Sequence, residues 1–217
     1  MKKIMRIGMV SFLVIGAAQA APITWGSATT VAGDADVSTV GELLYAESWG
    51  LAAAGINGVD FTLANTGNIS YVGGAQPRSD NVPSGITQSG GYYDLLRSIG
   101  YSADAGTSIT LNNLIAGHTY DVQLWSSDTR YGATQNLWLD GSSSVSLSTR
   151  DGQYTLGSFT ADATTQSITF LTAESGSASG IINAVQLRTT AIPEPATLGL
   201  LGAFGGGILF IRRRFRT

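Results

Sequence analysis

The sequence contains no cysteine and only one histidine, His118, among its 217 residues. Without cysteine the chain has no disulfide scaffold, no thiolate metal site and no cysteine nucleophile. Basic residues are also scarce between residues 21 and 190, which hold five arginines and no lysine against 14 acidic residues. A segment with a net charge of −9 is a poor match for the basic surface with which nucleic-acid-binding proteins neutralise phosphates.

The first 20 residues have the layout of a secretory signal peptide. A cationic start is followed by an apolar run over residues 7–17 and by Ala-Gln-Ala at residues 18–20, a small-x-small site for cleavage before Ala21. The alternative is a retained N-terminal anchor, for which the apolar run is too short to span a bilayer comfortably. We therefore predict export, with a signal peptidase as a processing partner.

The other terminus combines a proline motif, an uncharged segment and a cluster of arginines. Residues 196–211 carry no charge. At a rise of 1.5 Å per residue they form about 24 Å of helix, somewhat short of the ~30 Å hydrocarbon core. We expect a weak transmembrane helix that is followed by cations on the cytoplasmic side: Arg212, Arg213, Arg214 and Arg216.

The order of these parts, which begins with Pro193-Glu194-Pro195, resembles the PEP-CTERM protein-sorting signal over residues 191–217. The resemblance implies recognition by an exosortase, a membrane-embedded cysteine protease or transpeptidase of Gram-negative bacteria that make exopolysaccharide. It also implies an inner-membrane intermediate that is cut near the motif and then reaches the cell surface or the extracellular space. Glu194 would be a recognition residue. The alternative is an ordinary C-terminal membrane anchor.

Residues 21–190 are expected to form one β-rich domain. Apolar and polar residues alternate with a period of two, the pattern of half-buried strands, at residues 59–63, 108–111, 120–125, 145–147, 167–170 and 181–188. The expected turns are Asn57-Gly58, Ala116-Gly117-His118, Asp140-Gly141 and Asp151-Gly152. A long loop is expected over residues 65–91.

One helix is expected around Tyr92, Leu95, Leu96 and Ile99, with Gly100 ending it. Many short strands with a single helix favour an all-β fold, an antiparallel β-sandwich of jelly-roll type. A β-helix is the competing fold, but no fixed repeat period runs along the body.

Several longer motifs run along the body. They include Asp36-Val37-Ser38-Thr39-x-Gly41, Asn57-Gly58-Val59-x-Phe61, Leu114-x-x-Gly117-x-x-Tyr120-x-Val122-Gln123-Leu124-Trp125, Gly152-x-Tyr154-x-Leu156-Gly157-x-Phe159 and Ile182-Asn183-Ala184-Val185-Gln186-Leu187-Arg188. With these motifs the body resembles a domain that lies between signal peptide and sorting signal in surface proteins of Planctomycetes and Verrucomicrobia, a resemblance that carries no activity. More loosely, it is similar to the galactose-binding and malectin-like jelly rolls that bind sugars.

Sugar binding needs aromatic faces together with hydrogen-bonding side chains. Alternation puts Trp125 opposite Val122 and Leu124, and Trp138 opposite its apolar neighbours, so both indoles lie on the outer face if the apolar residues face the core. The alternative is that a loop or the helix covers them, and that Arg130 simply pairs with Asp128. The candidate sugar-binding residues are Gln123, Trp125, Asp128, Arg130, Tyr131 and Trp138.

Catalysis and metal binding have weaker support in the sequence. His118 sits in a turn and no Gly-x-Ser-x-Gly elbow occurs, while the acidic residues include no recognisable glycosidase pair. Calcium is the metal best suited to the oxygen ligands, with Asp34, Asp36 and Asp140 as contributors, but their spacing is not that of an EF-hand. We therefore expect no catalytic residues, no resident metal and no cofactor.

Together these patterns predict a secreted, exosortase-sorted surface or extracellular-matrix protein without catalysis, associated with exopolysaccharide. A carbohydrate-binding module is the first alternative, and an extracellular glycan hydrolase is the second. The expected domains are a signal peptide at 1–20, a β-sandwich at 21–190 and a sorting signal at 191–217.

Overall fold

The computed structural model describes the body of the chain but neither terminal segment. The described residues run from 22 to 190, with gaps at residues 65, 72, 103–105, 131–133, 139–143 and 173–179. The signal peptide, the Pro193–Pro195 motif, the transmembrane segment and the terminal arginines therefore lie outside them and stay predictions. No helix among the described residues is long and apolar enough to cross a membrane.

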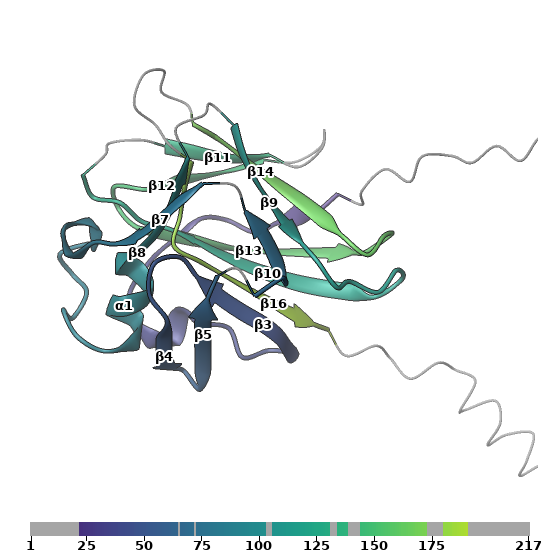
Figure 1. The fold of residues 1–217 in the computed structure, drawn as a ribbon, viewed down its shortest axis with the longest axis horizontal. Coiled ribbons are helices and arrows are strands. Elements are labelled where there is room, and N and C mark those ends of the chain that lie inside the picture. The colour runs from purple at the N-terminus through teal and green to yellow at the C-terminus, as the bar shows by residue number, and fades with distance from the viewer. Residues whose placement is uncertain are drawn as a thin grey trace, which may run out of the picture.

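Two β-sheets pack face to face and form the body of the molecule (Figure 1). The larger sheet has eight strands in the order β1-β13-β10-β16-β3-β5-β4, with β2 beside β13. Its strands are β1 (Thr24–Trp25), β2 (Thr29–Thr30), β3 (Glu42–Ser48), β4 (Ala53–Ile56), β5 (Val59–Leu63), β10 (Thr119–Ser126), β13 (Gln153–Thr160) and β16 (Ala184–Thr189).

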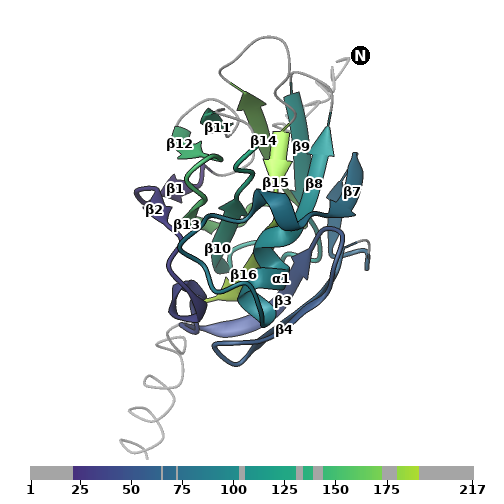
Figure 2. The same cartoon turned by 90° about the vertical axis from the view of Figure 1, so that its left-hand side faces the viewer.

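The opposing sheet has five strands in the order β12-β11-β14-β9-β6, and a three-stranded sheet, β15-β8-β7, lies beside α1 (Figure 2). These strands are β6 (Ile69–Tyr71), β7 (Gly74–Pro77), β8 (Ser98–Ser102), β9 (Gly106–Leu111), β11 (Thr134–Trp138), β12 (Ser144–Ser148), β14 (Gln166–Thr172) and β15 (Gly180–Ile182). The helical elements are η1 (Asp34–Asp36), η2 (Ser79–Asn81) and α1 (Gly91–Arg97).

This architecture confirms the predicted all-β sandwich. The chain crosses between the two large sheets at β9–β10, β10–β11, β12–β13 and β13–β14, which gives the jelly-roll-like connectivity. Every described strand pair is antiparallel except β3 with β5, where Glu47 lies beside Thr62. The Asn57-Gly58 turn joins β4 to β5 with both residues at positive φ, as a tight hairpin requires.

The main core lies between the two large sheets. Tyr120, Val122 and Leu124 of β10 point into it, as the alternation predicts, and Val185 and Leu187 of β16 lie alongside them. The Tyr120 hydroxyl accepts a hydrogen bond from the Ile115 amide at 2.8 Å. This tyrosine corner, which is common in β-sandwiches, explains the Leu-x-x-Gly-x-x-Tyr spacing that precedes β10.

A second core covers the opposite face of the large sheet. It is formed by α1, the β4–β5 hairpin and the segments around residues 31–37 and 82–86, all packed onto Trp125 and Ala184. Figure 2 looks onto the end of the molecule where α1 lies in front of β10 and β16. The large sheet is thus the middle of three layers where α1 and the β4–β5 hairpin cover it, whereas Leu156 and Ser158 of β13 are exposed on that face.

The α1 helix is shorter than predicted. Tyr92, Leu95 and Leu96 are buried on one of its faces, as expected, but the helix ends at Arg97, and Ile99 and Gly100 belong to β8. The predicted loop over 65–91 is wrong in part, because β6, β7 and η2 form within it. Gly100 is needed for packing, since a Cβ there would lie 2.8 Å from the Trp49 ring.

Asn183 connects the layers at the break between β15 and β16. Its fully buried side-chain amide donates to the carbonyls of Leu96 and Ser98, both at 2.7 Å, and of Ser127 at 3.1 Å. Its Oδ1 accepts the Ser127 amide, and its backbone N–H donates to the Trp125 carbonyl. The predicted single strand over 181–188 is therefore two strands, because Asn183 leaves the ladder to bind the end of α1 and the end of β10.

We predict that Asn183→Asp and Asn183→Ala each lower the free energy of unfolding by at least about 3 kcal/mol, because several buried backbone groups lose their partner. Asn112→Ala is the matched control, since its amide bonds to Gly67 and Ser70 lie at the surface, and it should cost less than about 1 kcal/mol. Urea denaturation monitored by circular dichroism measures all three. Equal losses for Asn183 and Asn112 would contradict a central role for Asn183.

Candidate functional site

The prediction that Trp125 lies on an exposed outer face is wrong. Trp125 is 0% exposed, because the second core covers the face from which it projects. Its ring packs edge-on against Phe61, with ring centroids 5.6 Å apart, and lies 6.2 Å from the ring of Tyr154. Trp125 is a core residue and offers no stacking surface to a sugar.

Gln123 is also buried, in a network that fastens the segment after η1 onto the sheet. Its Oε1 accepts from the Ser38 amide at 3.0 Å and from Gln186 Nε2 at 2.6 Å, and its own Nε2 donates to the Asp36 carbonyl at 2.6 Å. With these contacts Gln123 holds the chain in place, and its side chain is not available to a ligand.

Asp128 and Arg130 form a paired unit at the end of β10. The buried Asp128 carboxylate accepts from Arg130 Nε at 2.8 Å and from Nη2 at 2.6 Å, a two-pronged pair, and from the Arg130 backbone amide at 3.2 Å. The alternative given above, that Arg130 pairs with Asp128, is therefore correct. Tyr131 and Asp140 lie outside the described residues; Trp138 belongs to β11, but its side chain is not among those described.

Asp36, one of the aspartates suggested for calcium, serves the local fold. The Asp36 carboxylate accepts from the amides of Ala32 and Gly33 at 2.6 and 3.0 Å and from the Tyr92 hydroxyl at 2.6 Å. Burial and the carboxylate of Asp36 raise the pKa of Tyr92 above its ordinary value, so the hydroxyl stays a donor. Among the described residues no group of three acidic or histidine side chains gathers as a metal would require.

A polar cleft of about 670 Å³ opens at the end of the sandwich where β10 finishes. We call it the loop-end cleft. It is lined by Thr30, Val82, Pro83, Ser84, Gly85, Thr129, Arg150 and Asp151. These residues come from β2, from the loop after η2 and from the turns after β10 and β12, so four separate segments supply the walls.

Backbone contacts fix the walls of the loop-end cleft. Gly152, at φ +64°, touches the opposite wall, where an added Cβ would lie 2.6 Å from Pro83 Cγ. Its carbonyl accepts from the Val31 amide at 3.0 Å, and the Asp128 amide donates to the Thr149 carbonyl at 2.8 Å. The cleft therefore presents one guanidinium, one carboxylate and several hydroxyls on a rigid frame, a combination suited to hydroxyl-rich ligands.

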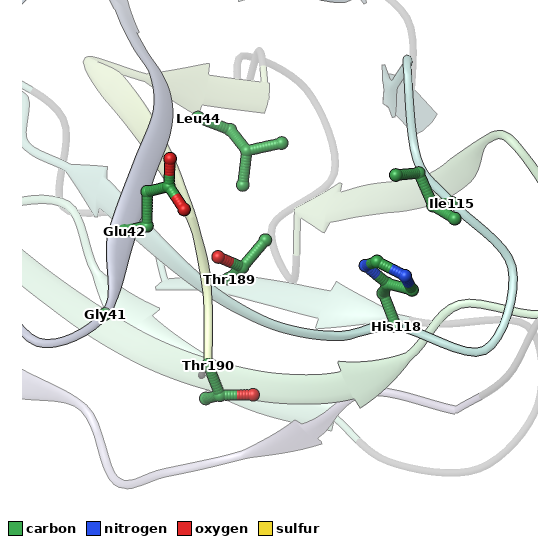
Figure 3. Close-up of a pocket in the computed structure, with 7 residues that line it drawn as sticks. All are labelled: Gly41, Glu42, Leu44, Ile115, His118, Thr189 and Thr190. Carbon is green, nitrogen blue, oxygen red and sulfur yellow. The ribbon is translucent and has the colours of Figure 1, made fainter. Parts of the chain in front are cut away.

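A second depression, of about 580 Å³, lies at the opposite end of β10. We call it the exit groove, because Thr189 and Thr190, the last described residues, form its floor. Figure 3 shows Leu44 and Glu42 on one side and Ile115 and His118 on the other, with the two threonines between them. Gly41 completes the lining.

Hydrogen bonds to neighbouring segments fix the backbone that forms the exit groove. The Thr190 amide donates to the Thr119 carbonyl at 3.2 Å, and the Ala161 amide to the His118 carbonyl at 2.9 Å. The imidazole of His118 stacks near Tyr120, with ring centroids 6.4 Å apart. Gly41 packs so closely that an added Cβ would lie 2.3 Å from the Thr189 carbonyl oxygen.

Glu47 is a buried acidic residue in β3. Its Oε1 accepts hydrogen bonds from the Thr66 hydroxyl and from Asn68 Nδ2, and Tyr45 of the same strand is also buried. Burial and the Glu47 carboxylate raise the pKa of Tyr45 above its usual range. Tyr45 is therefore neutral at physiological pH and unsuited to act as a base.

The sequence pattern did not single out the residues that line the loop-end cleft. Asp151-Gly152 was predicted only as a turn, and Arg150 and Ser84 belong to no motif. Four segments distant in sequence meet there, and the pairing of β2, β10 and β13 helps to bring them together. Of the predicted sugar-binding residues, Asp128 and Arg130 flank Thr129 of the cleft wall.

Comparisons with known proteins provide no family. No protein-family model matches the chain, and no curated protein matches it in sequence.

Among solved structures, the chain is similar to part of a β-glucuronidase from Bacteroides uniformis, at 15% identity and a TM-score of 0.47, over 67% of this chain and 17% of that one. An exo-β-1,3-galactanase from Phanerochaete chrysosporium matches at 16% identity and a TM-score of 0.31, over 63% and 32% of the two chains. An arabinoxylan arabinofuranohydrolase from Bacillus subtilis matches at 11% identity and a TM-score of 0.29, over 64% and 33%. The chain thus spans a third or less of each of these enzymes.

We predict that Gly152→Ala destabilises the fold by about 2–4 kcal/mol, because a Cβ at positive φ adds backbone strain to a collision with Pro83. Gly58→Ala is the matched control: its φ is +77°, but nothing lies within 4 Å of its added Cβ, so it should show the backbone strain alone. The difference between the two unfolding free energies reports how tightly the cleft walls are packed. Equal losses of unfolding free energy in the two variants would show that the cleft walls move apart at little cost.

Proposed function

We propose that this chain is an exported, non-catalytic β-sandwich protein that is sorted to the cell surface or to the extracellular polysaccharide matrix. One observation carries the proposal: the sandwich occupies residues 22–190, between the two predicted terminal signals, and Thr190 lies at the surface in the exit groove. The Pro193–Pro195 motif follows within five residues. A sorting enzyme in the membrane can therefore reach the motif while the sandwich stays folded.

The absence of catalysis is part of the proposal. Glycoside hydrolysis usually needs two carboxyl groups that flank the scissile bond, about 5–10 Å apart. The described lining of the loop-end cleft contributes one carboxylate, Asp151, and that of the exit groove also one, Glu42. Asp151 is already engaged, because its Oδ2 accepts from the Ser148 hydroxyl at 2.7 Å.

Glycan binding is the second candidate function, and the loop-end cleft favours it. Four polar residues line one opening of the cleft: Ser84, Thr129, Arg150 and Asp151. Because contacts already hold its walls, binding would cost little conformational entropy. The net charge of −9 favours neutral glycans over acidic ones. The predicted platform of Trp125 and Gln123 takes no part in this candidate site.

We predict that deletion of residues 192–217 releases the body into the surrounding medium, because the segment that would hold it in the membrane is gone. Replacement of Pro193, Glu194 and Pro195 by alanine is the matched control: it keeps the anchor and should leave the body in the inner membrane. Cell fractionation in a host that carries an exosortase measures both. Unchanged surface retention in both variants would refute the sorting signal.

For the second candidate, we predict that Arg150→Ala weakens binding of neutral oligosaccharides by about tenfold to a hundredfold, because a charged hydrogen bond contributes about 1.5–3 kcal/mol. Arg97→Ala, at a surface pair with Asp94 away from the cleft, should leave the affinity unchanged. A glycan array followed by calorimetry on residues 21–190 measures the effect. A folded protein that binds no glycan would remove this function and leave the first.

A further inference from the structure

Large apolar side chains are exposed in the lining of the exit groove and at residues next to it in the sequence. Val40 is 71% exposed, Leu43 37%, Leu44 38% and Ile115 55%. We call these four residues the apolar end. Leu44 and Ile115 line the exit groove from opposite sides (Figure 3). Leu43 follows Glu42 in β3, and Val40 precedes Gly41 of the lining. Exposed apolar side chains that gather at one end of a domain mark a contact surface.

The structure holds these side chains outward. The Ile115 amide is fixed by the Tyr120 hydroxyl at 2.8 Å, and the Ile115 carbonyl accepts from the His118 amide at 3.1 Å. On the other side Arg188 Nη1 donates to the Gly41 carbonyl at 2.9 Å. With its ends tied in this way, the apolar end cannot turn inward to join a core that is already filled.

The length of chain beyond Thr190 limits what can lie against this surface. Only residues 191–195 separate Thr190 from the uncharged segment 196–211. Five residues reach at most about 18 Å when fully extended. If that segment spans the bilayer, the exit groove is within this distance of the membrane surface, whereas the far end of β10 lies about 23 Å further along the strand.

We propose that the apolar end rests on the lipid surface while the chain is anchored. The proposal builds on the membrane anchor of the proposed function and adds the orientation of the body. Val40, Leu44 and Ile115 would enter the interfacial layer, with Glu42 and His118 among the headgroups at the rim. Because the body carries −9 and Glu42 lies in the groove, the contact is apolar and independent of anionic lipid.

This orientation has two consequences for the function. It holds residues 193–195 at the membrane surface, where a membrane-embedded enzyme works. It also turns the loop-end cleft, at the other end of β10, away from the bilayer and toward the matrix. Release from the membrane would then uncover the apolar end.

The lack of cysteine allows a direct test with single introduced thiols. The full chain carrying Ile115→Cys, Val40→Cys or Leu63→Cys is labelled with a fluorophore and reconstituted into phosphatidylcholine vesicles that contain a spin-labelled lipid. Leu63 is the matched control: it is 52% exposed, but it lies beside Ser48 at the opposite end of β3. We expect several-fold stronger quenching at positions 115 and 40 than at position 63.

Equal quenching at the three positions, with the chain floating with the vesicles, would overturn the orientation and leave the anchor intact. A chain that does not float with the vesicles would refute the anchor and the orientation together. Shielding at position 115 that grows with protein concentration, without lipid quenching, would overturn the proposal in favour of contact between two copies. In the Val40→Cys chain, Leu44→Ser with Ile115→Ser should lower the quenching to the value at position 63, with an unchanged thermal melt.

Discussion

The buried amide of Asn183 is the interaction on which the three layers depend. One side chain joins the end of α1 to the end of β10, and the backbone of Asn183 bonds to Trp125 of β10 and to Trp49, just after β3. These contacts cross between segments that are more than fifty residues apart in the chain, such as Asn183 and Ser127. An amide is suited to this place, because two donors and one acceptor on a small planar group satisfy several buried backbone groups without a buried charge.

Because the covering layer is tied down in this way, Trp125 and its neighbours on the large sheet are closed to ligands. The two clefts described above lie at the two ends of the sandwich. The ends differ in chemistry. The loop-end cleft gathers hydroxyls, a guanidinium and a carboxylate from turns, whereas the exit groove is rimmed by Leu44 and Ile115 and leads to the C-terminal segment. In the orientation that we propose, the polar end faces the matrix and the apolar end lies beside the membrane, so one small domain has two separate tasks.

The segments in which alternation predicted strands do lie in strands, because alternation is a local property, whereas other strands, such as β3 and β13, were not predicted. Val122 and Leu124 face the core as expected, and Asn57-Gly58 makes its hairpin. The same alternation could not tell a wet face from a second dry one, and Trp125 was placed wrongly for that reason. Whether that face is exposed or buried depends on α1 and the β4–β5 hairpin, which are distant from β10 in sequence. The residues of the loop-end cleft escaped prediction for the same reason, since strand pairing helps to assemble them.

The central claim is that the layer over Trp125 is an integral part of the fold and does not open as a lid. Amide hydrogen exchange tests it directly, by comparing the C-terminal turn of α1, Leu95–Ser98, with Val122–Trp125 of β10. The account predicts that both segments exchange through the same global opening, at free energies within about 1 kcal/mol of each other. Exchange in α1 that is orders of magnitude faster, while β10 stays protected, would contradict it and would return Trp125 to the surfaces that a ligand can reach.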